Sequence, residues 1–428
     1  MNSFRLKDVT RINRRTLPEQ TDPDFRFKYI DISAVSSTGR ISIPEEEITF
    51  SAAPSRARRL APAGSVVVST VRTYLRAIGA VPETQDPLVF STGFAVLEAE
   101  ADVDGRFLAH YCSSQPFIDE VVARSTGVSY PAINPSEIGD LRIQVPSLAK
   151  QRRIADFLDV ETGRIDALVE AQTHFMSRLA ERRRAGIIAA VTGQGHENLR
   201  ASKVPWLQTL PTDWPEVRLS LVARMGSGHT PSRSHPEWWT DCTIPWITTG
   251  EVKQVRDDRV EDLYETREKI SELGLANSAA ELHPKGTVFL CRTASAGYSG
   301  VMGLDMATSQ DFVTWTCGPR LVPHYLLWCL RAMRPDLLGR LAMGSTHKTI
   351  YVPDLQMLRI PLPSVEEQER IVEEIRRQNA RFDALTDRVR RQQELLRERR
   401  QALITAAVTG QFDVTTASGR NVTEGVSA

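Results

Sequence analysis

The chain has 428 residues, of which 41% are hydrophobic and 25% are charged, and it carries 53 Lys and Arg against 53 Asp and Glu. This composition predicts a soluble globular protein of two or three domains and excludes a chain that is disordered throughout. The balanced charge excludes a strongly basic protein, so any nucleic-acid surface must come from folding or from partner subunits.

The sequence contains no signal for a membrane or a metal. No apolar run reaches the ~18 residues of a membrane span, and the first residues, MNSFRLKDVT, lack an apolar signal-peptide core. We therefore expect a cytoplasmic protein without a membrane partner. The cysteines form no C-x-x-C pair and predict reduced, mostly buried thiols. They are Cys112, Cys242, Cys291, Cys317 and Cys329.

Residues 1–145 predict a first mixed α/β domain. Ser65–Val71 is a β-branched run typical of a strand, and Phe107–Cys112 predicts a short helix. Polar and aromatic side chains in the loops are candidates for contacts with a binding partner, although a solvated surface position is the alternative for each of them. The candidates are Arg56, Arg58 and Arg59 in a basic cluster, Arg72, Tyr74 and Arg76 after the strand, and Ser129 and Tyr130 in a Gly/Pro-bounded loop.

Residues 146–194 predict a long helix, with Pro146 before it and Gly193 at its end. From Ile154 onward, mostly apolar residues recur in alternating steps of four and three, which is the heptad pattern of a pairing helix. About 40 helical residues at ~1.5 Å each would give a rod of roughly 60 Å. The predicted pairing residues are Ile154, Leu158, Ile165, Leu168, Phe175 and Leu179.

Residues 195–213 have the composition of a linker, and residues 214–362 predict a second α/β domain. Two landmarks of the first domain recur here: the run from Gly64 resembles that from Gly286, and Gly127 to Ile133 aligns with Gly344 to Ile350. We expect a strand at Thr287–Leu290 and a helix at His324–Ala332. The contact candidates at matching places are Arg292, Tyr298, His347 and Lys348.

Residues 363–411 repeat residues 146–194 at a constant offset of 217, with 21 of 49 positions identical, and residues 412–428 predict a flexible tail. Two matching helices on similar domains predict an antiparallel coiled coil with pseudo-two-fold internal duplication. The alternative is that each helix only braces a domain core. The pairing residues of the second copy are Ile371, Ile375, Phe382, Leu385, Val389 and Leu396.

Basic residues recur at one place on both helices. Arg182, Arg183 and Arg184 on the first are matched by Arg399 and Arg400 on the second. We interpret them as helix-pairing residues or as part of an interface with another subunit, and DNA phosphate contact is the alternative.

The order of these features resembles the specificity (S) subunit family of type I restriction-modification systems. The resemblance covers nearly the whole chain and rests on two helices that open with P-S-x-x-x-Q-x-R-I and close with A-A-V-T-G-Q, and on the entry segment from Trp206 to Trp214-Pro215-Glu216-Val217-Arg218-Leu219. It implies that each domain recognises one half of a split, asymmetric target in double-stranded DNA, and that the contact candidates in its loops are DNA-contact residues. It also implies that the helices separate the halves and dock two adenine methyltransferase (modification) subunits, which restriction (motor-nuclease) subunits join.

The resemblance implies no catalytic site and no cofactor in this chain, with S-adenosylmethionine, ATP and Mg held by partner subunits. The sequence agrees, because Asn134-Pro135-Ser136-Glu137 lacks the second proline and the aromatic residue of a methyltransferase motif, and no phosphate-binding G-x-x-x-x-G-K-[ST] string occurs. Glu251-Val252-Lys253 has a nuclease-like spacing but no convincing upstream acid. A coiled-coil protein-binding scaffold is the alternative function.

Overall fold

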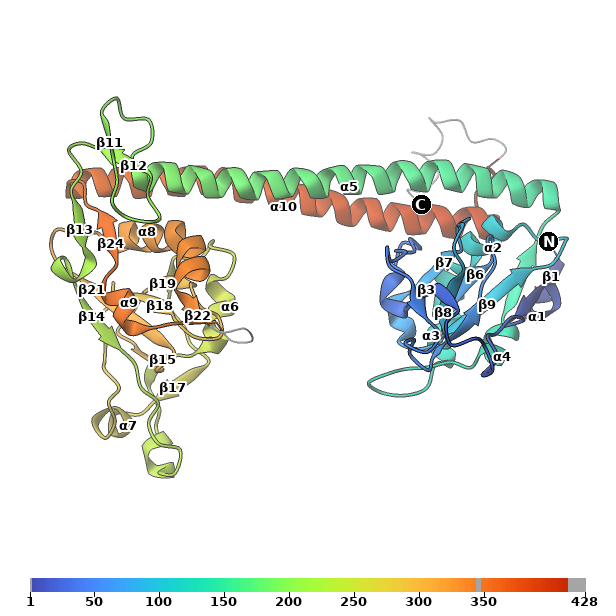
Figure 1. Ribbon diagram of the computed structural model, residues 1–428, viewed down its shortest axis with the longest axis horizontal. Helices are drawn as coiled ribbons and strands as arrows, with labels where there is room; N and C mark the ends of the chain where they lie inside the picture. The colour runs from blue at the N-terminus through green and yellow to red at the C-terminus, as the bar shows by residue number, and fades with distance from the viewer. Residues whose placement is uncertain (1, 344–347, 415–428) are drawn as a thin grey trace. The chain divides into compact units, whose positions relative to one another are not determined.

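The computed structural model describes residues 2–343 and 348–414 (Figure 1). The chain divides into two compact units, the first formed by Met1–Thr173 with Arg390–Ala428 and the second by His174–Val389. Each unit holds one α/β domain and part of each of two long helices, α5 (Leu148–Thr192) and α10 (Val365–Thr409). The predicted architecture of two similar domains and two long helices is therefore confirmed.

The first domain contains short strands and helices. They are β1 (Asn2–Arg5), α1 (Leu6–Val9), β2 (Thr10–Ile12), β3 (Arg26–Ile30), β4 (Ile48–Thr49), β5 (Ala57–Leu60), β6 (Val66–Ser69), β7 (Ile78–Ala80), β8 (Leu88–Ser91), β9 (Phe94–Ala99), α2 (Gly105–Cys112), α3 (Gln115–Arg124), α4 (Pro135–Gly139) and β10 (Arg142–Val145). The sheets have the strand orders β2-β9-β6-β7, β4-β3-β8-β5 and β1-β10. The predicted strand and helix appear as β6 and α2.

Strand β6 explains why the strand signal in the sequence was a continuous apolar run. Val66 and Val68 pack into a cluster that includes Phe107 of α2, whereas Val67 packs into the cluster on the other face of the sheet. A strand that is buried on both faces has apolar residues at consecutive positions and not only at alternate ones.

The second domain follows the same plan with more elements. They are β11 (Leu199–Ala201), β12 (Thr209–Pro211), β13 (Glu216–Arg218), β14 (Ala223–Ser227), β15 (Ile244–Ile247), α6 (Val252–Val255), β16 (Asp262–Leu263), β17 (Glu268–Ile270), α7 (Glu272–Ala276), β18 (Val288–Cys291), β19 (Ser299–Met302), β20 (Ala307–Thr308), β21 (Phe312–Cys317), α8 (Pro323–Asp336), β22 (Ala342–Met343), β23 (Thr349–Ile350), α9 (Val352–Gln356) and β24 (Arg359–Pro361).

The strand order shows that the two domains share a fold. The order β2-β9-β6-β7 recurs as β14-β21-β18-β19, with β16 added at the edge, and the pair β1-β10 recurs as β13-β24. Strand β3 pairs in parallel with β8, and β15 pairs in parallel with β20. The predicted strand and helix of this domain appear as β18 and α8.

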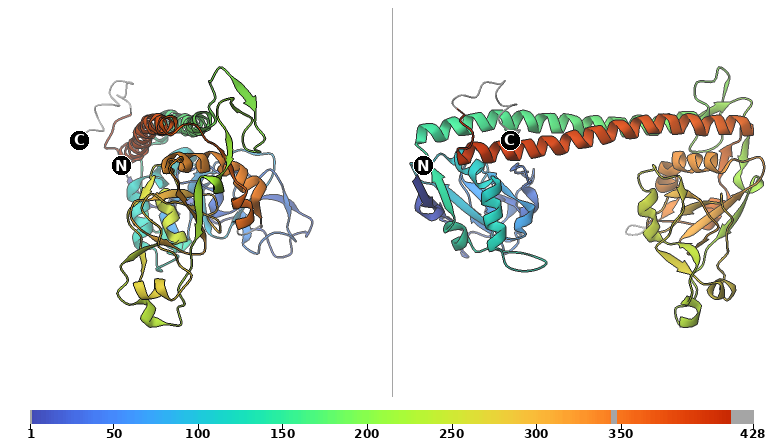
Figure 2. Two further views of the ribbon diagram at one scale, coloured as in Figure 1. Left: turned by 90° about the vertical axis from the view of Figure 1, so that its left-hand side faces the viewer. Right: turned by 180° about the vertical axis from the view of Figure 1, so that it is seen from behind.

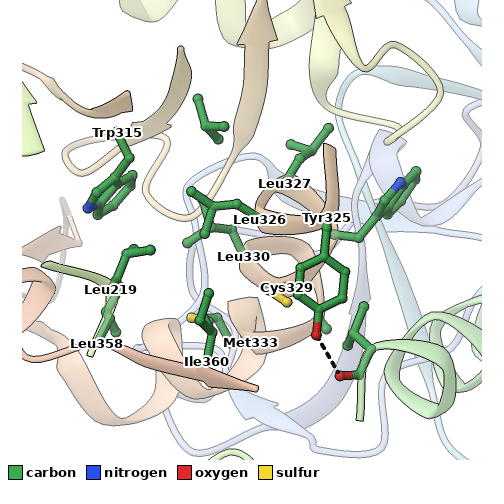
Figure 3. Close-up of a cluster of buried hydrophobic side chains, with 14 of the residues drawn as sticks. Leu219, Trp315, Tyr325, Leu326, Leu327, Cys329, Leu330, Met333, Leu358 and Ile360 are labelled. Atoms are coloured by element: carbon green, nitrogen blue, oxygen red, sulfur yellow. Dashed lines mark hydrogen bonds between the residues drawn. The ribbon is translucent and has the colours of Figure 1, made fainter. Parts of the chain in front are cut away.

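Helix α8 is the centre of the second core, where it lies between the sheet and the long helices of its unit (Figures 1 and 2). Tyr325 is fully buried, and its hydroxyl lies 3.1 Å from the carbonyl oxygen of Pro361 and 3.4 Å from that of Val191, either of which can accept its proton. Figure 3 draws one of these hydrogen bonds. Trp315 of β21 and Leu330 of α8 belong to the same cluster. The core therefore joins the domain to the end of α5.

Within each unit the long helices pack in antiparallel directions. In the second unit, Ile187 and Val191 of α5 belong to one cluster with Ile371 and Ile375 of α10. In the first unit, Ile154 of α5 packs in a cluster with Ile404 and Val408 of α10, and these halves lie side by side in Figures 1 and 2. Helix α5 ends at Thr192 and is followed by Gly193, which has φ +67° and at which a Cβ would lie 2.4 Å from Pro211. The predicted glycine stop is confirmed.

The contact line of the helices differs from the predicted one at every second step. Leu158, Ile165 and Val389 face inward, but Leu168 and Phe175 are 47% and 43% exposed. Leu385 is also exposed, at 37%. The inward positions lie one residue later along the chain and are largely polar: they include Thr162, Asn379, Gln393, Arg183 and Arg400. Counting apolar residues alone therefore selected Leu168, Phe175 and Leu385, which is a correction to the predicted set.

Two ion pairs at matching positions explain the polar contact line. In the second unit, Arg183 donates to Asp383 Oδ1 at 2.9 Å and to Asn379 Oδ1 at 3.0 Å. In the first unit, Arg400 Nε lies 2.9 Å from Asp166 Oδ1. The offset of 217 relates Arg183 to Arg400 and Asp166 to Asp383. Both arginines thus serve helix pairing within their units.

A buried glutamine joins each domain to its helix. Gln151 Nε2 donates to the carbonyls of Pro146 and Asp102, both at 2.9 Å, and its Oε1 accepts from the Asp104 amide at 2.8 Å. Gln368 makes the same set with Pro363, Arg320 and the Val322 amide at 2.9, 2.9 and 2.8 Å. The glutamine of the P-S-x-x-x-Q pattern is therefore an internal connector.

The segments expected as linker and tail contain ordered structure. Residues 195–213 form the hairpin β11-β12, in which Arg200 pairs with Leu210. Phe412 packs against Phe157 with ring centroids 5.6 Å apart, because this side chain covers apolar surface of the first core. Residues 415–428 of the predicted tail lie outside the described residues. Among the helices that are described, none is long and apolar enough to cross a membrane.

Candidate nucleic-acid interface

The turn between β6 and β7 presents the open candidates of the first domain. Arg72 and Arg76 have φ values of +51° and +54°, a left-handed conformation that costs non-glycine residues about 1–3 kcal/mol each and that clusters at functional sites. The Arg72 amide donates to the Pro131 carbonyl at 2.8 Å, and the Arg72 guanidinium lies 4.7 Å from the Tyr130 ring centroid. The structure therefore brings two predicted loops, around Arg72 and Tyr130, together.

This pair of loops forms an exposed surface that is basic and aromatic. Tyr74 is 54% exposed and Tyr130 65%, and Ser129 beside it is also exposed. Within the described part of the chain, neither Arg72 nor Arg76 has a carboxylate at ion-pair distance. Arginines without a protein counter-ion can pair with phosphates or base edges.

The basic cluster at residues 56–59 does not act as one surface. Arg56 is exposed but ion-paired with Asp31 at 2.6 Å, and Arg58 lies over the Phe50 ring at 4.6 Å. Arg59 is partly buried, and burial lowers the pKa of its guanidinium. The pairing of β5 with β8 shifts register between Ala57 and Arg59, which leaves Arg58 as the extra residue at this irregularity. Arg58 is the member of this cluster that lacks a carboxylate partner among the described residues and is not turned inward.

The candidates of the second domain are more covered. Arg292 Nε donates to the Gln310 carbonyl at 3.0 Å. The Tyr298 ring is half-buried, with the guanidinium carbons of Arg334 and Arg256 at 4.7 and 5.6 Å from its centroid. Lys348 is exposed, and its Nζ lies 3.4 Å from the Leu338 carbonyl. His347 lies outside the described residues.

The sequence interpretation missed a basic and aromatic segment between β14 and β15, residues 232–239. The Arg233 guanidinium lies 3.8 Å from the Trp239 ring centroid, and His235 stacks on Trp238 at 4.2 Å with an interplanar angle of 16°. The segment is anchored, because Trp239 packs edge-on against Trp246 and Ser271 donates to the Trp238 carbonyl at 2.6 Å.

This segment packs on α7, at the side of the domain opposite α8 (Figure 1). Basic residues interleaved with aromatic ones in the string SRSHPEWW were the available signal. The segment belongs with the predicted loops as a candidate contact surface.

Glu251, the acid of the nuclease-like string, has a structural role. It is 2% exposed, and its carboxylate accepts from the Arg267 amide at 2.9 Å and from Gln254 Nε2 at 2.5 Å. No group of three or more His, Cys, Asp or Glu that could hold a metal occurs among the residues described. The cysteines are unpaired, and burial raises the pKa of Cys291 and Cys329 to about 12, which makes these thiols unreactive.

Comparisons with known proteins relate the chain to a single family. A model of the type I restriction modification DNA specificity domain matches residues 1–171 and 211–394. The chain is 27% identical over 190 residues to the MjaIX specificity subunit of Methanocaldococcus jannaschii, covering 44% of this chain and 42% of that protein. It is 22% identical over 338 residues to the EcoBI specificity subunit of Escherichia coli, covering 76% and 70%. A solved chain from work on assembly and conformational transition of the type I R-M system gives a TM-score of 0.74 at 26% identity, covering 95% of this chain and 97% of that one.

Proposed function

Since the chain belongs to the type I restriction-modification DNA specificity family, we propose that its two domains each recognise one half of a split, asymmetric target in double-stranded DNA. The family consists of recognition subunits, and the chain is a non-catalytic member of it. The proposal that the target is split and asymmetric depends on the structure of this chain's two domains.

One observation carries the proposal: the same strand order recurs in both domains with different side chains on the loops. The first domain presents Arg72, Tyr74 and Tyr130, whereas the second presents Arg233 and the pair Trp238-Trp239. Base edges are distinguished by the side chains that reach them, and phosphate contacts only fix the register. Two domains with one scaffold and different loops should therefore recognise two different half-sites.

We further propose that the long helices dock two methyltransferase subunits, that restriction subunits join this complex, and that it acts in the cytoplasm. Large apolar side chains that are exposed on both helices are compatible with a protein partner, because apolar surface that one chain leaves open can be covered by another. Val160 is 52% exposed and Leu395 56%. S-adenosylmethionine, ATP and Mg would belong to the partner subunits, and the methyltransferases would flip the target adenines.

The test is to co-express the chain with the methyltransferase subunit encoded beside it and to map methyladenine across the host genome. We expect a split, asymmetric motif that disappears when the chain is omitted. A chimera with residues 214–362 exchanged for those of a relative should change one half of the motif only. A soluble complex that methylates no motif would contradict the proposal and favour a protein-binding scaffold.

A further inference from the structure

The second unit contains a pocket of about 410 Å³ that is rich in arginine. It lies between α5, the C-terminal end of α8 and the turn after α6. Five guanidinium groups line it against two carboxylates, those of Asp257 and Asp258. We call it the arginine pocket; its arginines are Arg183, Arg184, Arg256, Arg331 and Arg334.

The inner wall of the arginine pocket is fixed by Asp258, whose backbone has φ +59°. Arg334 donates two hydrogen bonds to the Asp258 carboxylate, at 2.6 and 2.9 Å. Arg331 is 5% exposed, donates to the Asp258 carbonyl at 2.9 Å, and has its Nε 3.3 Å from the same carboxylate. Arg183 reaches the Asp258 carbonyl at 3.2 Å. Three guanidiniums are thus held in place around a single aspartate.

The arginines that line the pocket outnumber its carboxylates. The other carboxylate, Asp257, is shared with Arg259 at 3.7 Å. Burial is the main reason why the pKa of Arg331 is lowered to about 10; the carboxylates of Asp258 and Glu261 oppose this shift, and the positive charges of Arg334 and Arg183 add to it. Arg183 also pairs with Asp383, which lies outside the pocket lining, at 2.9 Å. Five guanidiniums against Asp257, Asp258 and Asp383 leave an excess of positive charge at the pocket, which favours an anion.

Two guanidiniums at the mouth of the arginine pocket form no ion pair with the described part of the chain. Arg184 and Arg256 are exposed, and no carboxylate among the described residues lies within ion-pair distance of either. Arg256 lies over the Tyr298 ring at 5.6 Å, which restricts its orientation. Internal ion pairing explains Arg331 and Arg334, but it does not explain these two residues.

We propose that the arginine pocket binds a phosphate group, with Arg184 and Arg256 making the direct contacts and the fixed arginines behind them supplying positive potential. A guanidinium presents paired N–H donors that match phosphate oxygens, and such charge-assisted bonds are the strong ones. The phosphate comes either from the DNA backbone, which rests on the proposed function, or from a free phosphate compound. The two sources give different results in the two arms of the test.

The first arm measures binding of the full chain to duplex DNA by fluorescence anisotropy over a series of salt concentrations. Arg184→Gln and Arg256→Gln should each lower the slope of log affinity against log salt by about 0.9, the value for one lost phosphate contact. Arg256→Lys, which keeps the charge, should stay near the wild-type slope. Arg182→Gln is the matched control, because Arg182 is exposed on the same helix but does not line the pocket.

The second arm measures binding of inorganic phosphate and pyrophosphate to the chain by calorimetry. The pocket would be assigned to a free phosphate compound if two results are found together. The salt slopes for DNA would be unchanged in Arg184→Gln and Arg256→Gln, and both variants would lose the binding of phosphate that the wild type shows. Unchanged slopes without phosphate binding would overturn the proposal, as would an equal effect of Arg182→Gln. If the wild-type chain binds no duplex DNA, the proposed function fails, and the second arm still decides for or against the pocket.

Discussion

Two buried glutamines are the residues on which the attachment of each domain depends. Gln151 satisfies two carbonyls and one amide, in one buried and two partly buried hydrogen bonds, and Gln368 does the same in the second unit. Replacement by leucine keeps the volume but leaves the buried carbonyl unpaired, at about 1–3 kcal/mol, and removes two partly buried hydrogen bonds worth about 0.5–1 kcal/mol each. We expect Gln151→Leu and Gln368→Leu each to lower the free energy of unfolding by about 2–5 kcal/mol.

Urea unfolding followed by circular dichroism measures this loss. Gln144→Leu is the control, because Gln144 is exposed in the neighbouring strand β10 and should change stability by less than about 0.5 kcal/mol. Equal losses for Gln151→Leu and Gln144→Leu would show that the buried hydrogen bonds contribute little.

Asp159 makes the first unit sensitive to acid. Its carboxylate lies 2.7 Å from His110 Nε2 and 3.0 Å from Arg106, and the hydrogen bond with His110 is the main reason why the pKa of Asp159 is lowered. A carboxyl with a lower pKa in the folded than in the unfolded state stabilises the fold above its unfolded pKa of ~3.9. That stabilisation is lost as the pH falls through the folded value.

The melting temperature of the wild type should therefore fall as the pH is lowered below about 4, and Asp159→Asn should reduce the fall. Thermal unfolding at a series of pH values measures it, with Asp119→Asn, an exposed site in the same domain, as the control for loss of one charge. A fall as steep in Asp159→Asn as in the wild type would contradict this assignment.

Among the elements, the contact between a domain and its long helix has reversed charges in the two units: the helix residue is acidic in the first unit and basic in the second. Asp159 of α5 and Arg376 of α10 occupy equivalent positions under the offset of 217. The first domain places Arg106 against Asp159 at 3.0 Å, and the second places Glu261 against Arg376 at 2.8 Å. A domain moved onto the other helix would meet a like charge, so each domain matches its own helix.

This charge reversal predicts a measurable coupling between Glu261 and Arg376. Arg376→Glu alone should destabilise the chain by about 1 kcal/mol, whereas the double variant Glu261→Arg/Arg376→Glu should recover most of that loss. A double-mutant cycle by urea unfolding measures the coupling energy. Additive effects of the two changes would mean that the contact does not discriminate between the helices.

The helices also show how far the sequence predicts the structure. The duplication and the heptad period located both long helices and half of each contact line, because Leu158, Ile165 and Val389 are apolar and inward. The other half of the contact line was predicted at the wrong positions. A polar side chain can face inward between two antiparallel helices when it is hydrogen-bonded there, as Arg183 is. Periodicity in apolar residues does not record such pairs.

The sequence predicted which loops form the candidate interface, but not which of their side chains are exposed. Glycine and proline punctuation identified the loops around Arg72 and Tyr130, and the structure brings them together. Nothing in the sequence showed that Tyr298 would lie between guanidiniums or that Arg56 would be paired with Asp31. Those contacts join residues far apart in the chain and arise only on folding.

In the molecule as a whole, the duplication means that a single long helix contains both members of each pair of residues that join α5 to α10. Arg183 of α5 pairs with Asp383, whose counterpart on α5 itself is Asp166. Ile404 and Val408 of α10, which pack in the cluster with Ile154, correspond to Ile187 and Val191 of α5. Two copies of α5 could therefore form the same antiparallel contacts that α5 and α10 form within the units.

We accordingly expect a fragment of residues 1–194 to form a homodimer, measured as a doubled mass by light scattering after gel filtration. Asp166→Arg should weaken the dimer, because the introduced guanidinium would face Arg183 of the other copy, and adding Arg183→Asp should restore it. With two identical domains, the dimer should direct methylation to a palindrome of the first half-site. A fragment that remains monomeric at micromolar concentration would show that α10 contributes contacts, such as Leu403 in place of Gly186, that a second α5 cannot replace.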